Sequence, residues 1–129
     1  MRNLFVQGAL LGLSLLLALG CASAYRNGVR LLEEKKYDEA IAELETATTA
    51  DPEDRDIQEA MTRAKTEGAG ERVERARLYR EETDLGKARE NLAQALAWVP
   101  GHPGASLLLP GVEAEIKAAE GLRAEAREA

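Results

Sequence analysis

The residues of this 129-residue chain that could carry chemistry are one cysteine, one histidine and 23 aspartates and glutamates. Cys21 is the only thiol, so it can be modified or act as a nucleophile, but it has no partner for an intramolecular disulfide. His102 lies between two turn sequences, Pro100-Gly101 and Pro103-Gly104, and lacks the further histidine or cysteine that a zinc site needs. We therefore expect His102 to be a solvated loop residue, and we expect no metal site and no cofactor.

The carboxylates are the remaining candidates for catalysis, because a hydrolase needs only two of them in one cleft. Some of them form adjacent pairs, Glu33-Glu34, Glu53-Asp54 and Glu81-Glu82, a pattern typical of helix ends and solvated helix faces. The sequence contains no glycine-rich phosphate loop and no HExxH or GxSxG motif. We therefore expect a protein that is not an enzyme, and a carboxylate-dependent hydrolase is the catalytic alternative.

Cys21 follows an N-terminal segment with its own pattern. Met1, Arg2 and Asn3 form a basic start, residues 4–19 are predominantly apolar, and Gly20 precedes the cysteine. This order is typical of a secretory signal peptide. The segment resembles the signal peptide of bacterial lipoproteins, although Ala18 and Leu19 stand in the reverse of that family's usual order. The resemblance implies that residues 1–20 are removed, that Cys21 is lipidated, and that the mature chain begins at Cys21.

Three alternatives concern the same segment. Ala22-Ser23-Ala24 is an A-x-A site, and cleavage after Ala24 would release a soluble periplasmic protein without the cysteine. An uncleaved membrane anchor is the second, although residues 4–19 fall short of the roughly 20 residues that span a bilayer. The third is that Cys21 is a buried or chance cysteine with no chemistry. The position of the sole cysteine favours lipidation, and its two or three acyl chains would anchor the protein stably. Ala22 and Ser23, with no aspartate after Cys21, resemble lipoproteins sorted to the outer membrane, facing the periplasm.

Composition indicates the fold class. Removal of residues 1–20 would take only Arg2 from the 17 basic residues and leave all 23 acidic ones, a net charge of −7. An acidic chain is a poor ligand for phosphates, so we expect no nucleic-acid partner. Ala, Glu, Leu, Arg and Lys dominate, and these are strong helix formers. We therefore predict one all-α domain over residues 21–129.

An internal repeat links two parts of this domain. Residues 28–52 and 76–100 share a pattern of small and bulky residues 48 positions apart, at Gly28/Ala76, Leu31/Tyr79, Tyr37/Leu85, Ala40/Ala88, Leu44/Leu92, Ala47/Ala95 and Pro52/Pro100. Both segments resemble the tetratricopeptide repeat, a 34-residue helix–turn–helix unit. The resemblance implies TPR-like repeats, about two units followed by a closing helix, in which the small residues let neighbouring helices approach closely. The alternative is an ordinary pair of helical hairpins with alanine-rich packing.

The pattern also predicts the elements. We expect repeat one over about 21–54, a long linking helix over about 53–82, a second repeat over about 69–102 and a closing helix over about 104–127. Glycine costs about 1 kcal/mol in a helix interior. Gly68-Ala69-Gly70 could therefore divide the linking helix. The sequence leaves open whether this segment forms one helix or two. Pro52 and Pro100 should end helices. We expect Pro110 to kink the closing helix and residues 127–129 to fray.

The resemblance further implies a partner-binding groove lined by the first helix of each repeat. Mapped onto this chain, its residues are Tyr25, Val29, Leu32, Glu33, Val73, Arg77, Arg80 and Glu81. Arg77 and Arg80 could bind carboxylates or a peptide C-terminus; alternatively they pair with neighbouring glutamates on a mixed-charge surface. The sequence therefore predicts a lipid-anchored, non-catalytic adaptor for an unknown protein of the bacterial cell envelope. A self-associating scaffold, a homo-oligomer, is the structural alternative.

Overall fold

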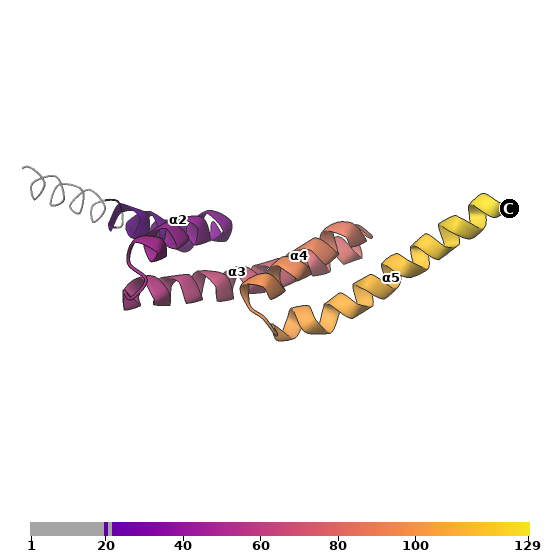
Figure 1. The fold of residues 1–129 in the computed structure, drawn as a ribbon. Helices are drawn as coiled ribbons and strands as arrows, with labels where there is room; N and C mark the ends of the chain where they lie inside the picture. The colour runs from indigo at the N-terminus through magenta and orange to yellow at the C-terminus, as the bar shows by residue number, and fades with distance from the viewer. Residues whose placement is uncertain (1–19, 21) are drawn as a thin grey trace, which may run out of the picture. The chain divides into compact units, whose positions relative to one another are not determined.

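A computed structural model of the chain describes residues 20 and 22–129. All regular secondary structure within that range is helical, which confirms the all-α prediction (Figure 1). The signal peptide and the lipidation of Cys21 fall on residues 1–19 and 21, and these predictions therefore lie outside the described residues.

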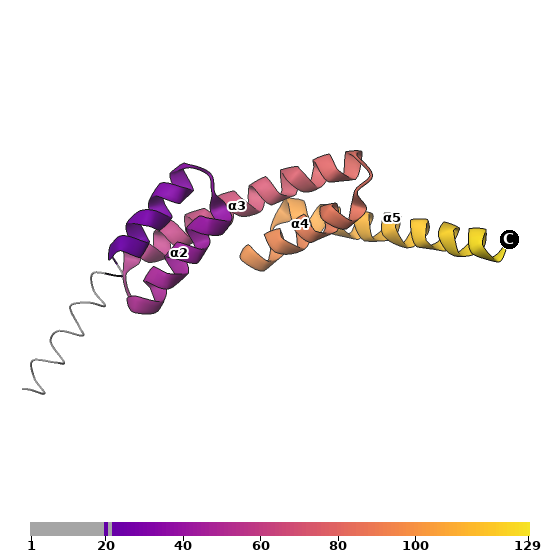
Figure 2. The same cartoon turned by 90° about the horizontal axis from the view of Figure 1, so that it is seen from above.

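A first helix over residues 22–33 is followed by α2 (Tyr37–Ala50), α3 (Arg55–Glu81), α4 (Leu85–Trp98) and α5 (Pro103–Glu128) (Figures 1 and 2). The short helices α2 and α4 each contain 14 residues and begin 48 positions apart. The long helices α3 and α5 contain 27 and 26 residues and also begin 48 positions apart. The 48-residue period of the sequence is therefore a short helix followed by a long one.

The structure answers one question about the long helices that the sequence left open, and it corrects one expectation. Gly68 and Gly70 lie inside α3, which is one continuous helix. Between them Ala69 packs in a core cluster with Val73 and Ala76, and such tertiary packing outweighs the low helix propensity of glycine. α5 continues through Pro110 and reaches Glu128, beyond the point where fraying was expected.

The chain divides into two compact units, Met1–Lys65 and Thr66–Ala129, with the boundary inside α3. In the described part of the first unit, residues 22–33, α2 and the start of α3 pack around a buried core. Its fully buried positions include Leu32, Ala40, Leu44 and Ala47. A β-carbon added to Gly28 would lie only 2.6 Å from Cγ of Leu44, so the first two helices approach as closely as the repeat pattern predicted (Figure 2).

The second unit repeats this packing with the end of α3, α4 and α5. Ala88, Leu92 and Ala95 are fully buried, as are their counterparts Ala40, Leu44 and Ala47 in α2. A β-carbon added to Gly104 of α5 would lie 3.1 Å from Cγ1 of Val73 on α3. Seven residues further along both helices, one added to Gly111 would lie 3.6 Å from Nη2 of Arg80. These helices therefore lie side by side and run in the same direction.

Candidate functional site

The first helix and α3 form a groove in the first unit. Tyr25, Val29 and Leu32 lie on one face of the first helix, because they are spaced four and three residues apart. They line a groove of about 250 Å³ opposite four residues of α3, which are Asp56, Glu59, Ala60 and Arg63. Leu32 is only 2% exposed and forms the floor, whereas Tyr25 and Val29 are half-buried. Three of the residues predicted for a groove are thus brought together. The fourth residue from this helix, Glu33, is exposed and is not among the lining residues.

A charge cluster closes the C-terminal end of the first helix. Nζ of Lys36 donates to Oε2 of Glu34 at 2.8 Å, and Nη1 of Arg30 donates to Oε1 at 2.6 Å. The hydrogen bond from Lys36, followed by that from Arg30, holds the pKa of the Glu34 carboxyl below its usual value. These exposed groups are engaged with one another and do not line the groove, which fits the expectation of solvated charges at a helix end.

The residues predicted from the second repeat occupy different surroundings. Val73 is 3% exposed and packs in the core of the second unit, so its side chain does not face a partner. Nη1 of Arg77 lies 3.5 Å from Oε1 of Glu74, with both side chains more than half exposed. Glu81 is exposed at the last residue of α3. Arg77 and Glu81 are therefore the members of this set that reach solvent most freely.

Arg80 is engaged within the second unit. Its Nε donates to Oε1 of Glu115 on α5 at 3.0 Å, and its Nη2 contacts the same oxygen. The hydrogen bond from Arg80 lowers the pKa of the Glu115 carboxyl, and the same contact raises the pKa of Arg80. Glu115 lies against α3, so Arg80 has a carboxylate partner within its own chain.

Two arginines of α3 show how mixed charge is used on this helix. Arg75 pairs with Glu71 one turn away. Nη1 of Arg72 donates to Oδ1 of Asn91 at 3.1 Å, and its guanidinium lies 5.3 Å from the centre of the Trp98 ring. Asn91 is only 7% exposed, and its Nδ2 donates to the carbonyl of Lys87. These contacts join α3 to α4. Arg72 therefore has a structural role here, and its contact with Asn91 was not foreseen from the sequence.

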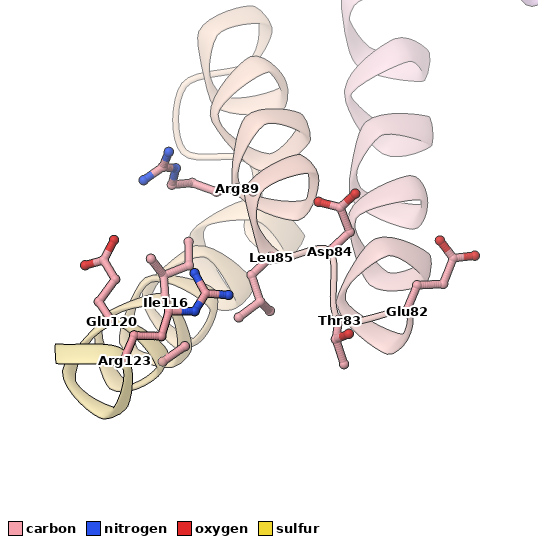
Figure 3. Close-up of a pocket in the computed structure, with 10 residues that line it drawn as sticks. Glu82, Thr83, Asp84, Leu85, Arg89, Ile116, Glu120 and Arg123 are labelled. Carbon is pink, nitrogen blue, oxygen red and sulfur yellow. The ribbon is translucent and has the colours of Figure 1, made fainter. Parts of the chain in front are cut away.

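A second groove, of about 710 Å³, lies in the second unit between the α3–α4 turn and α5 (Figure 3). Its apolar part consists of Leu85, Ile116 and Ala119. The close-up shows Arg89 on α4 and, across the groove, Glu120 and Arg123 on α5. Sequence reasoning missed this groove, because its two sides lie some 30 residues apart in the chain. The available signal was the apolar stripe of α5, which includes Ile116 and Ala119.

The turn beside this groove is fixed by Asp84. Its Oδ1 accepts a hydrogen bond from the backbone N–H of Lys87 at 3.1 Å, which makes Asp84 the N-cap of α4. Nζ of Lys87 lies 2.9 Å from Oδ2 of Asp84. This contact, followed by the backbone hydrogen bond, lowers the pKa of Asp84. The side-chain contact also raises the pKa of Lys87. Thr83, just before the cap, has a φ of 63°.

His102 has a structural role that the sequence analysis did not assign. It is half-buried at the N-cap of α5, and its Nδ1 accepts a hydrogen bond from the backbone N–H of Ala105 at 3.4 Å. In residues 20 and 22–129, no cluster of three histidine, cysteine or acidic side chains is arranged to hold a metal ion. Over the same residues, no helix has the length and apolar character needed to cross a bilayer.

Comparison of the chain with family models, with curated proteins and with solved structures finds no match. The groove of the first unit offers an apolar floor bordered by two carboxylates and one guanidinium, which can accept an apolar side chain next to a charged group.

Proposed function

We propose that this chain is a non-catalytic adaptor of the bacterial cell envelope, with a TPR-like domain that binds a partner protein and a lipid on Cys21 that holds it at a membrane. The observation that carries the proposal is the groove of the first unit, in which Tyr25, Val29 and Leu32 face α3. Support for the TPR-like part comes from the 48-residue repeat of a short and a long helix with buried alanines at matched positions.

The size of the groove favours a protein partner. Pockets for small ligands usually measure about 300–1,000 Å³. A groove of about 250 Å³ is smaller and better suited to one or two side chains of a partner segment. Its floor would accept an apolar side chain, and Asp56 and Glu59 on the border favour a basic residue beside it.

The position of the groove along the chain connects it to the proposed anchor. The first helix is described from residue 22, and Tyr25 lies about 4.5 Å further along the helix axis. Cys21 directly precedes residue 22 in the sequence. A lipid on Cys21 would therefore hold the groove next to the headgroups, with almost no tether. A partner would meet the adaptor at the surface of the membrane, which we assign to the periplasmic face of the outer membrane.

Partner capture by two matched variants tests the binding part of this proposal. Val29→Glu places a charge in the groove, whereas Asn27→Glu adds the same charge at an exposed position of the same helix. Full-length tagged protein is crosslinked in bacterial envelopes, solubilised in detergent and purified. We expect the parent and Asn27→Glu to retain the same partner. The amount of this partner that co-purifies with Val29→Glu should be at least ten times smaller. Equal retention by both variants, with helicity unchanged by circular dichroism, would refute the groove assignment.

A further inference from the structure

The two carboxylates that border the groove of the first unit are not neutralised by the described chain. Asp56 and Glu59 are exposed and lie three residues apart on α3, which places them on the same face of the helix. Among residues 20 and 22–129, neither side chain makes an ion pair or a hydrogen bond. Arg63, the basic residue on the same border, is already engaged in another interaction within the chain. The groove therefore presents two uncompensated negative charges.

The basic residues on the neighbouring part of the first helix have other partners. Nε of Arg26 donates to the backbone carbonyl of Ala22 at 3.2 Å. Nη1 of Arg30 donates to Oε1 of Glu34 at 2.6 Å. Neither arginine belongs to the lining of the groove. A cation that neutralises the two carboxylates of the groove would thus have to come from a bound molecule.

Tyr25 lies at the same end of the groove as Asp56. It packs against a buried cluster that includes Ile57, the residue directly after Asp56 on α3. Tyr25 is half-buried and lines the groove. An aromatic ring attracts a cation, and the apolar stem of a lysine or arginine packs well against such a ring. A tyrosine beside two free carboxylates is therefore suited to the side chain of a lysine or an arginine.

The second repeat shows that the charged border does not follow from the repeat pattern. Gly104 and Gly111 of α5 stand 48 positions after Asp56 and Arg63 of α3. A β-carbon added to Gly104 would lie only 3.1 Å from Cγ1 of Val73, so α5 lies close against α3 there. In the first repeat the corresponding residues carry charged side chains, and these border a groove. The charged groove is therefore a property of the first repeat in particular.

The far end of the groove is apolar. Leu32, only 2% exposed, forms the floor, and Val29 lies between it and Tyr25 on the first helix. Tyr25 and Leu32 are seven residues apart, which corresponds to about 10 Å along the helix axis. About three residues of an extended chain span this distance. One short segment could therefore place a basic side chain at the acidic end and an apolar side chain over Val29 and Leu32.

We propose that the groove of the first unit recognises a basic segment of its partner, anchored by a lysine or arginine whose charged group lies between Asp56 and Glu59 beside Tyr25. An apolar residue within about three positions of this cation lies over the floor. The inference rests on the proposed function in one respect, namely that the groove binds a protein. The net charge of the whole chain, −6, favours the approach of a basic partner. Salt should weaken the complex, because the contacting carboxylates are exposed.

Selection from a library of random peptides displayed on phage tests the chemistry of the ligand. The bait is the full-length protein in detergent, and peptides that bind equally to Val29→Trp, which fills the groove without changing its charge, are discarded. We expect the remaining peptides to contain lysine or arginine near an apolar residue about three times more often than the unselected library. Remaining peptides without this enrichment would overturn the inference and leave the groove as a binding site. If no peptide depends on Val29, the groove assignment fails, and this inference fails with it.

Neutralisation of the two carboxylates measures their role directly. Asp56→Asn/Glu59→Gln preserves the size of both side chains, whereas Asp51→Asn/Glu53→Gln removes the same charge at two exposed positions outside the groove. A selected basic peptide with a fluorescent label is titrated with each protein, and circular dichroism checks that helicity is unchanged. We expect the dissociation constant to rise about tenfold for the groove variant and less than about twofold for the control. Equal changes would overturn the proposal, because they would indicate general attraction to an acidic chain.

Reversal of the charges tests the sign of the recognised group. Asp56→Lys/Glu59→Lys should bind the selected peptide more weakly than the parent does. It should bind about tenfold more tightly than the parent to a version of the peptide in which glutamate replaces each basic residue. An unchanged preference for the basic peptide would contradict the anchoring role of the two carboxylates.

Discussion

Arg80 of α3 and Glu115 of α5 form an ion pair between residues 35 positions apart, with Nε of the arginine 3.0 Å from Oε1 of the glutamate. This pair lies where the two long helices of the second unit pass beside each other. It also engages a guanidinium that the resemblance to the tetratricopeptide repeat had placed in a partner-binding groove. The contact therefore has consequences for both stability and binding.

Glu115→Gln should reduce stability near neutral pH by a small amount, because both side chains are about 40% exposed and water screens their attraction. The pKa of Glu115 is lowered in the folded state, so the unfolded state binds more protons between the two pKa values. The pair therefore stabilises the fold fully above the ordinary glutamate pKa, and this stabilisation is lost as the pH falls through the lowered pKa. The difference in melting temperature between parent and variant should shrink as the pH falls from about 5 through the lowered pKa. Thermal unfolding by circular dichroism at several pH values measures this. A difference that grows in acid would contradict the assignment.

Two glycine-to-alanine changes should have opposite effects. Gly28→Ala places a methyl group 2.6 Å from Cγ of the fully buried Leu44, and the overlap should cost about 1–3 kcal/mol in unfolding free energy. At Gly70, inside α3, an added methyl group meets nothing within 4 Å. Gly70→Ala should therefore stabilise the protein by up to about 1 kcal/mol through helix propensity. Urea unfolding of both variants provides the comparison, and equal shifts would refute the close approach at Gly28.

Two substitutions of Asp84, the N-cap of α4, should separate the contribution of its hydrogen bond to stability from the contribution of its charge. Asp84→Asn keeps an oxygen that can accept from the N–H of Lys87, whereas Asp84→Ala removes it. We expect the melting temperature of Asp84→Ala to fall by several degrees, and that of Asp84→Asn to fall less. Because Lys87 lowers the pKa of Asp84, the advantage of the parent over Asp84→Asn should be lost as the pH falls through that pKa. If both variants behave alike at every pH, the cap contributes nothing.

Equivalent leucines of the repeat should contribute equally. Leu44 and Leu92 occupy the same position 48 residues apart, and both are fully buried. Leu44→Ala and Leu92→Ala should each cost about 2–5 kcal/mol in unfolding free energy. Leu78→Ala, at a position 59% exposed on α3, should change it by less than about 0.5 kcal/mol and serves as the control. A small effect at only one of the buried leucines would show that the two units are not packed alike.

The repeat pattern was sufficient to predict the helices and much of the core. Alanines and leucines at fixed spacing identified the buried faces of α2 and α4, and Pro52 and Pro100 predicted where those helices end. The continuity of α3 could not be predicted, because the cost of Gly68 and Gly70 is local, whereas the packing of Ala69 that compensates for it depends on the fold.

The candidate sites were harder to predict for the same reason. The resemblance to the tetratricopeptide repeat pointed to Tyr25, Val29 and Leu32, and all three line the groove of the first unit. The contacts that Arg80 and Val73 make depend on α5, a helix far away in the sequence. The second groove likewise needs the α3–α4 turn and Ile116 to be brought together by folding. Local spacing does not contain that information.

The most direct test of the proposed anchor is mass spectrometry of the intact protein extracted from bacterial membranes. The account predicts a mature chain that begins at Cys21 and carries two or three acyl chains. Replacement of the cysteine, Cys21→Ser, should abolish that modification and release the protein from the membrane fraction. An unmodified chain that begins at Tyr25, or an uncleaved chain that begins at Met1, would contradict it.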